Sequence, residues 1–326
     1  MPIFFKLHNI IEVKVILFYL VMILASFIYG CGPAGTFFDP TLGLHLARVV
    51  VAGGTANSLA IYDINGNFIQ RLRDYNVWSD VPRNVLAVDY KKFLVVVDGV
   101  DRIEEFDLTT GPRTWAANAQ YGGAATLGDV AKDSAGSYYA IETTTNTIEK
   151  FDASGNRQPL SGATPFIATI LGSCTLSGAS NLTVIPNGYL AVVSSTNARV
   201  NYYDISTATA SCASSVTGAP YAAAGPKGIL AHSNGKIYVG LNTSNTIVEL
   251  DQLSLASTTI WAANTSVIQT VAGFAEMPDG TILVASQVTS SIERITTAGV
   301  RVGTTPFIKD AYTAAVNSVI VLRGSN

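Results

Sequence analysis

Four oxygen-bearing side chains occupy the same place in successive copies of a repeating pattern in this sequence. Each stands where a loop gives way to a short apolar segment, and two further copies carry Gly228 and Gly273 there. Calcium takes roughly six to eight oxygen ligands, including carboxylate and amide oxygens. If the segments surround a common axis, the four side chains form one candidate calcium site. They are Asn84, Asp129, Asn181 and Asn317.

The same residue types also have a structural interpretation. Asn, Asp and Gly are common where a chain turns into a strand, because they form local hydrogen bonds or tolerate unusual backbone angles. Asp98 and Glu142 end neighbouring apolar segments and would add negative charge at the same rim. Short motif matches carry a high risk of false positives. A hydrogen-bonded ring around water is therefore favoured over the calcium site, and both interpretations stay open.

The histidines do not support a hydrolytic triad. Beyond residue 30 the sequence contains His45 and His232, and neither has an identifiable Ser or Asp partner. The sequence also lacks a phosphate-binding loop, a zinc-binding Cys/His set and a dinucleotide fingerprint. We therefore expect no resident cofactor apart from the candidate Ca²⁺, and the residues favour a role that is not enzymatic.

The elements that would position these residues repeat six times. Each copy has an apolar run rich in β-branched and aromatic residues, then a loop, then a strand-like segment that closes on Asp or, in the last copy, Thr296. Four antiparallel strands at a spacing near 45 residues make one propeller blade. The predicted fold is therefore all-β, a six-bladed β-propeller of four-stranded antiparallel blades. The recurring segments are 57–63, 101–107, 146–152, 197–204, 245–251 and 290–296.

The two ends of the propeller are expected to meet in one blade. The first copy begins at its second strand, near Ala47, and a strand-like segment without a copy of its own stands at 315–323. That segment aligns with 82–90 when Asn317 is matched to Asn84. The C-terminal strand should therefore complete blade 1 and remove the open sheet edge.

The N-terminal segment resembles a bacterial lipoprotein signal peptide. Val15 to Tyr29 are uncharged and follow Lys14, a length that suits a signal-peptide core better than a membrane-spanning helix. Ile28-Tyr29-Gly30-Cys31 resembles the lipobox, from which Tyr29 departs because a small residue is usual there. The resemblance implies cleavage before Cys31 and lipidation of its thiol. An uncleaved membrane anchor is the alternative.

This interpretation divides the chain into a signal peptide (1–30), a lipidated Cys31 with its tether (31–45) and the propeller (46–326). It places the protein in the bacterial cell envelope as a membrane-anchored lipoprotein, in the outer membrane and facing the periplasm or the surface. Cys174 and Cys212 then remain as an even pair. In an oxidising compartment they are expected to form a disulfide, with two free thiols as the alternative.

Composition excludes one class of partner. The formal net charge is −3, charged residues make up 13% of the chain, and no basic stripe is present. Nucleic-acid binding needs clustered Lys and Arg to neutralise phosphates, so no nucleic-acid partner is expected. The hydrophobic share of 48% is sufficient for a large core.

Two segments carry a family resemblance. GPKGILAHSNGKIYVGLNTSNTIVELD (225–251) and PRNVLAVDYKKFLVVVDGVDRIEEFD (82–107) resemble the NHL repeat. Over about 46–323 the chain resembles six-bladed propellers of the NHL, YVTN and SMP-30/gluconolactonase kinds. NHL-type domains mostly bind proteins or other ligands. The SMP-30 branch hydrolyses lactones with a divalent metal, but this chain lacks the Glu-Gly-Pro motif of that branch.

The resemblance, together with the missing catalytic groups, implies a membrane-tethered module that binds a protein, peptide or envelope component through one rim. The alternative is a calcium-dependent, lactonase-like hydrolase that uses the oxygen-bearing residues. A third possibility is a purely structural subunit of an envelope assembly.

Overall fold

The computed structural model describes residues 47–75, 80–99, 102–116, 126–158, 165–217, 220–221, 225–252, 254–262, 264 and 266–323. The predicted signal peptide (1–30), Cys31 and the tether (31–45) lie outside these residues and stay predictions. Within the described ranges, no helix has the length and apolar character that crossing a membrane requires.

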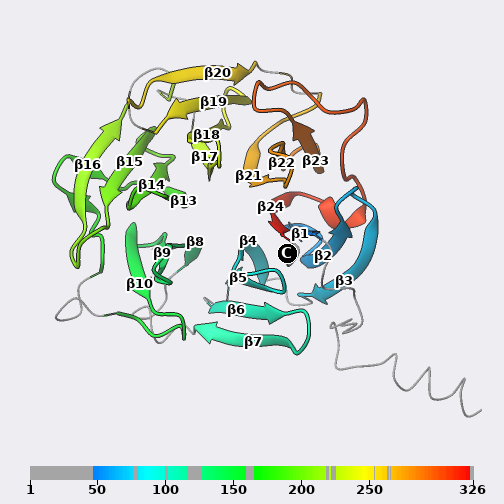
Figure 1. Ribbon diagram of the computed structural model, residues 1–326, viewed down its shortest axis with the longest axis horizontal. Helices are drawn as coiled ribbons and strands as arrows, with labels where there is room; N and C mark the ends of the chain where they lie inside the picture. The colour runs from blue at the N-terminus through cyan, green and yellow to red at the C-terminus, as the bar shows by residue number, and fades with distance from the viewer. Residues whose placement is uncertain are drawn as a thin grey trace, which may run out of the picture.

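Six antiparallel sheets surround a central axis as the blades of a propeller, which confirms the predicted fold (Figure 1). Four blades have four strands each, numbered in chain order but named below from the axis outward. Blade 1 contains β24 (Val316–Leu322), β1 (Arg48–Gly53), β2 (Ser58–Asp63) and β3 (Phe68–Asp74). Blade 2 contains β4 (Val81–Ala87), β5 (Lys92–Asp98), β6 (Arg102–Asp107) and β7 (Gly111–Ala116). Blade 4 contains β13 (Ala179–Ile185), β14 (Tyr189–Ser194), β15 (Arg199–Asp204) and β16 (Ser211–Val216). Blade 5 contains β17 (Pro226–Ala231), β18 (Lys236–Leu241), β19 (Thr246–Asp251) and β20 (Ser257–Trp261).

In the part of the chain that the structure describes, blades 3 and 6 have three regular strands each, and their outermost segments pair at isolated bridges. Blade 3 contains β8 (Leu127–Lys132), β9 (Tyr138–Glu142) and β10 (Thr147–Phe151). Blade 6 contains β21 (Val271–Glu276), β22 (Ile282–Ser286) and β23 (Ser291–Ile295), followed by the 3₁₀ turn η2 (Ala311–Thr313). The bridges are Phe151 to Arg157, Ile148 to Ile167, Ile295 to Arg301 and Ile292 to Ile308.

A buried ion pair holds each of these irregular outer segments in place. Arg157 Nε donates to Glu149 Oε2 at 2.7 Å in blade 3, and Arg301 Nε donates to Glu293 Oε2 at 2.9 Å in blade 6. Both carboxylates are buried. Because a buried charge is costly without a partner, the Arg residues keep the outer segments against the sheets despite the missing ladder bonds.

The C-terminal strand closes the ring, as the sequence predicts. β24 pairs with β1 along its length, from Arg48 opposite Leu322 to Gly53 opposite Val316. The first and last strands of the domain therefore share one sheet, coloured blue and red in Figure 1. β24 therefore covers the edge of β1 that faces the axis.

The core is divided among the interfaces between neighbouring blades. Successive side chains of a strand point to opposite faces. Val49 and Val51 of β1 accordingly pack towards Leu283 of blade 6, whereas Val50 packs towards Val95 of blade 2. Six such clusters follow one another around the ring, one for each pair of adjacent blades. The rigidity of the axis depends on all six interfaces.

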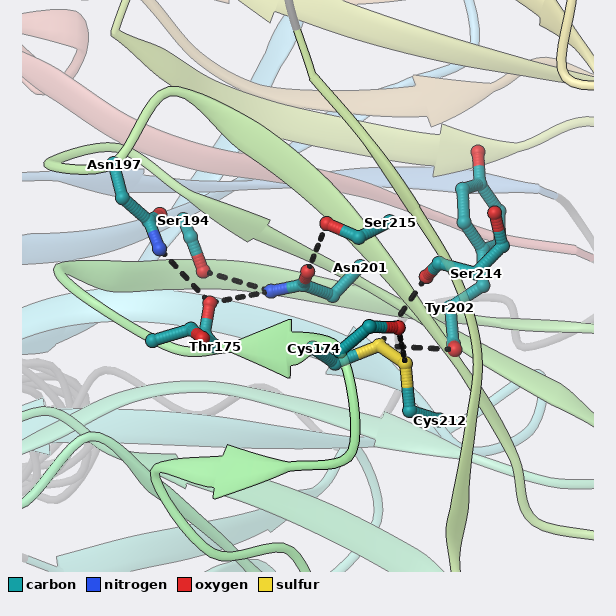
Figure 2. The surroundings of a disulfide bond; sticks show 10 residues. Cys174, Thr175, Ser194, Asn197, Asn201, Tyr202, Cys212, Ser214 and Ser215 are labelled. Atoms are coloured by element: carbon teal, nitrogen blue, oxygen red, sulfur yellow. Dashed lines mark hydrogen bonds between the residues drawn. A yellow bond between two sulfur atoms is a disulfide. The ribbon is translucent and has the colours of Figure 1, made fainter.

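The predicted disulfide joins Cys174 to Cys212, with the two Cα atoms 5.6 Å apart (Figure 2). Cys174 belongs to a small hairpin of β11 (Ile170–Leu171) and β12 (Cys174–Thr175), and Cys212 lies in β16. The Asn201 side chain of β15 donates to the carbonyl oxygen of Thr175 at 2.8 Å. The bond and this contact fasten the inserted hairpin to blade 4.

Candidate functional site

The inner strand of every blade carries one extra residue at the same place. The register between inner and second strand shifts by one residue in β24, β4, β8, β13, β17 and β21. Such a β-bulge redirects a side chain and is common beside functional sites. We call the residues at these shifts the bulge residues. In blades 1 to 6 they are Asn317, Arg83, Gly128, Ser180, Lys227 and Ala272.

All six bulge residues line one cavity of about 190 Å³ at one end of the axis, which we call the rim cavity. Its charged lining residues are Arg83 and Lys227, and no carboxylate lines it among the described residues. Thr126, Thr143 and the ring residues Asn84 and Asn181 add polar groups. The rim cavity is therefore polar and positively charged.

The two cations have different surroundings. Arg83 Nε donates to Asp98 Oδ2 at 2.7 Å, and its side chain remains 50% exposed. Lys227 Nζ donates to Gln287 Oε1 at 3.3 Å, a neutral partner. Burial lowers the pKa of Lys227, and the nearby Arg83 charge lowers it further. The ammonium group of Lys227 is thus the less well compensated of the two charges.

Side chains from blades 1, 2 and 4 meet at the floor of the rim cavity. The amide oxygen of Asn84 accepts hydrogen bonds from Val85 N and from Ser318 Oγ, both at 2.7 Å. Asn84 Nδ2 donates to the amide oxygen of Asn181 at 3.0 Å, and the amide nitrogen of Asn181 donates to the carbonyl oxygen of Lys227. A hydrogen-bonded chain therefore crosses the axis and separates the rim cavity from the space behind it.

Asp129 of blade 3 lies behind this floor and is only 5% exposed. Its carboxylate accepts hydrogen bonds from Val130 N at 2.7 Å and from Leu182 N at 2.9 Å, so it links blade 3 to blade 4. Burial raises the pKa of Asp129 to about 7, and the backbone hydrogen bonds from Leu182 and Val130 oppose that effect only in part.

The alignment of the C-terminal strand is off by one residue. Pro82 and Val316 precede the bulges in blades 2 and 1, so Arg83 matches Asn317 and Asn84 matches Ser318. Asn317 accordingly lies at the rim. There its Nδ2 donates to the carbonyl oxygen of Pro82 at 2.9 Å, and its Oδ1 accepts from Gln287 Nε2 at 3.0 Å. The sequence alignment matched Asn317 to Asn84 by residue type, whereas the bulges, which both strands carry, match Asn317 to Arg83.

The structure thus brings together three of the four candidate calcium ligands, with Ser318 in the place expected for Asn317. Their described oxygens already accept hydrogen bonds within the protein, and an ion would have to replace those bonds. Among the described residues, no three or more His, Cys, Asp and Glu side chains gather into a group that could hold a metal. The donor set fits the hydrogen-bonded ring, and the calcium assignment stays a prediction.

Two further carboxylates that the sequence placed at this rim have local partners. Asp98 holds Arg83, as described above, and Glu142 accepts hydrogen bonds from the backbone of Thr144 and Thr145 at 2.8 and 2.6 Å. Both therefore have structural roles. Sequence reasoning missed Arg83 and Lys227, although each directly precedes a residue of the predicted ring.

A second cavity of about 250 Å³ lies on the other side of the floor, and we call it the opposite cavity. Most of its lining is apolar, with Leu182, Ile229 and Phe274 as examples. Its titratable lining residues are Asp129, described above, and Glu276 and Arg323, whose oxygen and nitrogen atoms lie 3.2 Å apart. The charges of Glu276 and Arg323 compensate each other.

His232 lies close to this opposite end and is buried. Its Nδ1 accepts a hydrogen bond from Asn234 N, which leaves Nε2 to donate to the carbonyl oxygen of Gly280 at 3.1 Å. Ser233 Oγ donates to Glu276 at 2.5 Å and not to the imidazole. The geometry of a nucleophilic triad, with serine bonded to histidine, is not present in this cluster.

Comparison with known proteins supports the fold and does not identify the function. No family model and no curated protein matches the chain. A chain of a nidogen–laminin complex has a TM-score of 0.63 and 11% identity, over 86% of this chain and 100% of that one. Streptogramin B lyase has a TM-score of 0.59 and 12% identity, over 84% and 83%. A proposed 6-phosphogluconolactonase from Bacteroides uniformis has a TM-score of 0.56 and 12% identity, over 85% and 99%. The neighbours therefore include a member of a protein–protein complex, a lyase and a lactonase-like protein, all on one fold.

Proposed function

We propose that the protein is a membrane-anchored lipoprotein that binds an envelope component through its rim cavity. One observation carries the proposal: the bulge residues of all six blades line the same cavity. Six separate strands redirect a residue to one place, which is the arrangement expected of a ligand site on a rigid scaffold. The nidogen–laminin neighbour is consistent with a binding role for this fold.

The anchoring part of the proposal rests on the lipobox-like segment that ends at Cys31. Expression of the full chain in a bacterial host, followed by membrane fractionation, tests it. The wild-type chain should sediment with membranes, and mass spectrometry should find acyl chains on an N-terminal Cys31. A Cys31→Ala variant that stays equally membrane-bound and is equally processed would contradict lipidation.

The binding part is tested by recovery of the cross-linked protein from the envelope of the producing cells. Wild type and the control Arg323→Ala, which alters the opposite cavity, should retain the same bound component. Lys227→Ala combined with Arg83→Ala should lose it. Equal recovery by all three proteins would show that the rim cavity is not the binding surface.

A lactonase-like hydrolase is the second candidate function. The observation in its favour is the convergence of Asp129, Asn84 and Asn181, with the pKa of Asp129 raised to about 7 by burial. A group with a pKa near neutrality can exchange protons during catalysis. Calcium should then raise the melting temperature, and Asp129→Asn should abolish both that effect and lactone hydrolysis. Without either signal in the wild type, the binding role is preferred.

A further inference from the structure

We propose that the rim cavity is a site for a small oxyanion, a carboxylate or phosphate group held between Lys227 and Arg83. This inference rests on the proposed binding role and names the chemistry of the ligand. The cavity, at about 190 Å³, is smaller than the roughly 300–1,000 Å³ of pockets that hold drug-sized molecules. It accommodates one small charged group or the end of a larger molecule.

The positions of the two cations suit a shared anion. Arg83 belongs to blade 2 and Lys227 to blade 5, and these blades face each other across the axis (Figure 1). Both residues line the rim cavity, and the charge of Arg83 lowers the pKa of Lys227. Two like charges held close together at one cavity repel each other. An anion placed between them would turn that repulsion into attraction on both sides.

Lys227 has unused hydrogen-bonding capacity. An ammonium group carries three N–H donors, and the partner of Lys227 in the structure is the amide oxygen of Gln287 at 3.3 Å. Arg83 differs, because Asp98 already neutralises it. The structure therefore assigns Lys227 as the main anion-binding group, with Arg83 as the second charge across the cavity.

Ser180 supplies an independent observation. This bulge residue of blade 4 also lines the rim cavity, and its buried hydroxyl has no hydrogen-bond partner in the described structure. A buried polar atom without a partner costs free energy, so such atoms usually meet water or a ligand. A hydroxyl donor beside an ammonium group matches the needs of an oxyanion, which accepts several hydrogen bonds at once.

The opposite cavity gives an internal contrast. It also contains an arginine, Arg323, but Glu276 lies 3.2 Å from it. An oxyanion arriving there would have to compete with that carboxylate. The rim cavity has no carboxylate in its described lining. An oxyanion should therefore bind at the rim cavity and not at the opposite cavity.

Isothermal titration of the purified full chain with sodium phosphate and with sodium acetate, at constant ionic strength set by NaCl, tests the inference. Wild type should bind at least one of the two anions. Lys227→Gln should weaken that binding about tenfold, as loss of a charge-assisted contact predicts. Lys236→Gln is the matched control, because Lys236 lies in the same blade and pairs with Asp251 outside the cavity. The Lys236→Gln protein should bind the anion with an affinity within about twofold of wild type. Tighter binding of phosphate would identify the group that the site binds as a phosphate, and tighter binding of acetate would identify it as a carboxylate.

Two results would overturn the inference: no binding of either probe by wild type, or equal affinity in wild type and Lys227→Gln. If Lys227→Gln fails to fold, the pKa of Lys227 is measured instead, by NMR of its side chain in the wild-type protein. The bound anion should raise the pKa of that lysine, and an unchanged pKa at saturating phosphate and acetate contradicts the site. The cross-linking experiment described above tests the binding of an envelope component separately. If the protein binds the anion but no envelope component is recovered, the anion site is supported and the proposed binding function is contradicted.

Discussion

The two cavities on the axis share a floor and differ in their charges. Asn84 and Asn181 line both. On one side, Lys227 has an amide as its partner, and no carboxylate lines the rim cavity in the described structure. On the other, Glu276 and Arg323 pair with each other within a largely apolar wall, and the buried Asp129 accepts hydrogen bonds from the backbone of Val130 and Leu182.

The difference distinguishes charged side chains that pair within the protein from charged side chains that can still bind a ligand. A charged group whose partner is built into the protein contributes to folding and has little left to offer a ligand. A partly buried charge without such a partner is costly to keep. The proposed function therefore places ligand binding at the rim cavity, and four experiments can break or sharpen this comparison of the two cavities.

The largest effect is expected from deletion of residues 314–326, which removes β24 and with it one wall of both cavities. Burial of its five aliphatic side chains is worth roughly 10 kcal/mol, which is comparable to the whole net stability of a typical domain, about 5–15 kcal/mol. Circular dichroism should show no cooperative melting. Deletion of 324–326 alone is the control and should melt like the wild type. A cooperative transition in the longer deletion would mean that the ring does not need this strand.

The next effect concerns Asp129, just behind the shared floor. Its pKa is about 7 in the folded protein against an ordinary value of 3.8, so the folded state keeps a proton that the unfolded chain loses. The free energy of unfolding should therefore decrease as pH rises from about 4 to about 7, by up to about 4 kcal/mol from this group. In Asp129→Asn that decrease should be absent. Urea unfolding at pH 5 and pH 8 measures it.

Asp279→Asn is the control for this experiment, since Asp279 is exposed and ion-paired, with hydrogen bonds from Thr281 that lower its pKa. It should keep the wild-type difference in unfolding free energy between pH 5 and pH 8. Parallel pH profiles for wild type and Asp129→Asn would mean that Asp129 is ionised in the folded protein, and the second candidate function would lose its support.

A smaller effect is expected at the mouth of the opposite cavity. Burial alone would raise the pKa of Glu276, but hydrogen bonds from Ser233 and the charges of His232 and Arg323 lower it. The stabilisation is present above the ordinary pKa of 4.5 and is lost as pH falls below it. In urea unfolding, Glu276→Gln should lower the free energy of unfolding by about 1 kcal/mol at pH 7 and by progressively less as pH falls below 4.5.

Phosphate and acetate titrations of Glu276→Gln sharpen the comparison further. The affinity of the rim cavity should be unchanged, because the variant leaves its lining intact. If removal of this carboxylate instead weakens anion binding about tenfold, the two ends of the axis are coupled and the division between them is wrong.

The smallest loss of stability is expected for Ser180→Ala. The hydroxyl of Ser180 is buried without a partner among the described residues, so its removal should leave the free energy of unfolding equal or raise it by about 1 kcal/mol at most. If the hydroxyl serves the ligand, the same variant should weaken anion binding several-fold. Ser195→Ala is the contrasting control, because the Ser195 hydroxyl donates to the carbonyl oxygen of Gly178. A Ser180 variant that binds the anion as tightly as wild type removes this residue from the site.

The fold could be predicted from the sequence because each blade repeats the same apolar and turn signals. The closing strand was found in the same way, as a segment without a copy of its own at 315–323. The pairing of Cys174 with Cys212 could also be predicted, since they are the even pair left after Cys31. These features depend on repeated apolar runs, turn residues and the number of cysteines, which can be recognised even where individual residues differ between the copies.

The candidate site could be predicted only in part. Matching Asn317 to Asn84 by residue type placed Asn317 where the structure has Ser318, because the position of a bulge leaves no mark in residue type. The sequence likewise contains no signal that Arg83 and Lys227 lie at bulges and line one cavity. Their meeting at one cavity depends on the closure of the ring, which places blades 2 and 5 face to face and leaves no signal in either segment alone.

The pairing of β24 with β1 also fixes the end of the axis at which the described chain enters the propeller. Arg48, where the described part of β1 begins, lies opposite Leu322, at the end of blade 1 away from Asn317 and the rim cavity. The chain therefore enters the propeller from the face that carries the opposite cavity. The proposed lipid on Cys31 would thus join the domain on the side of the opposite cavity, and the rim cavity lies at the other end of the axis.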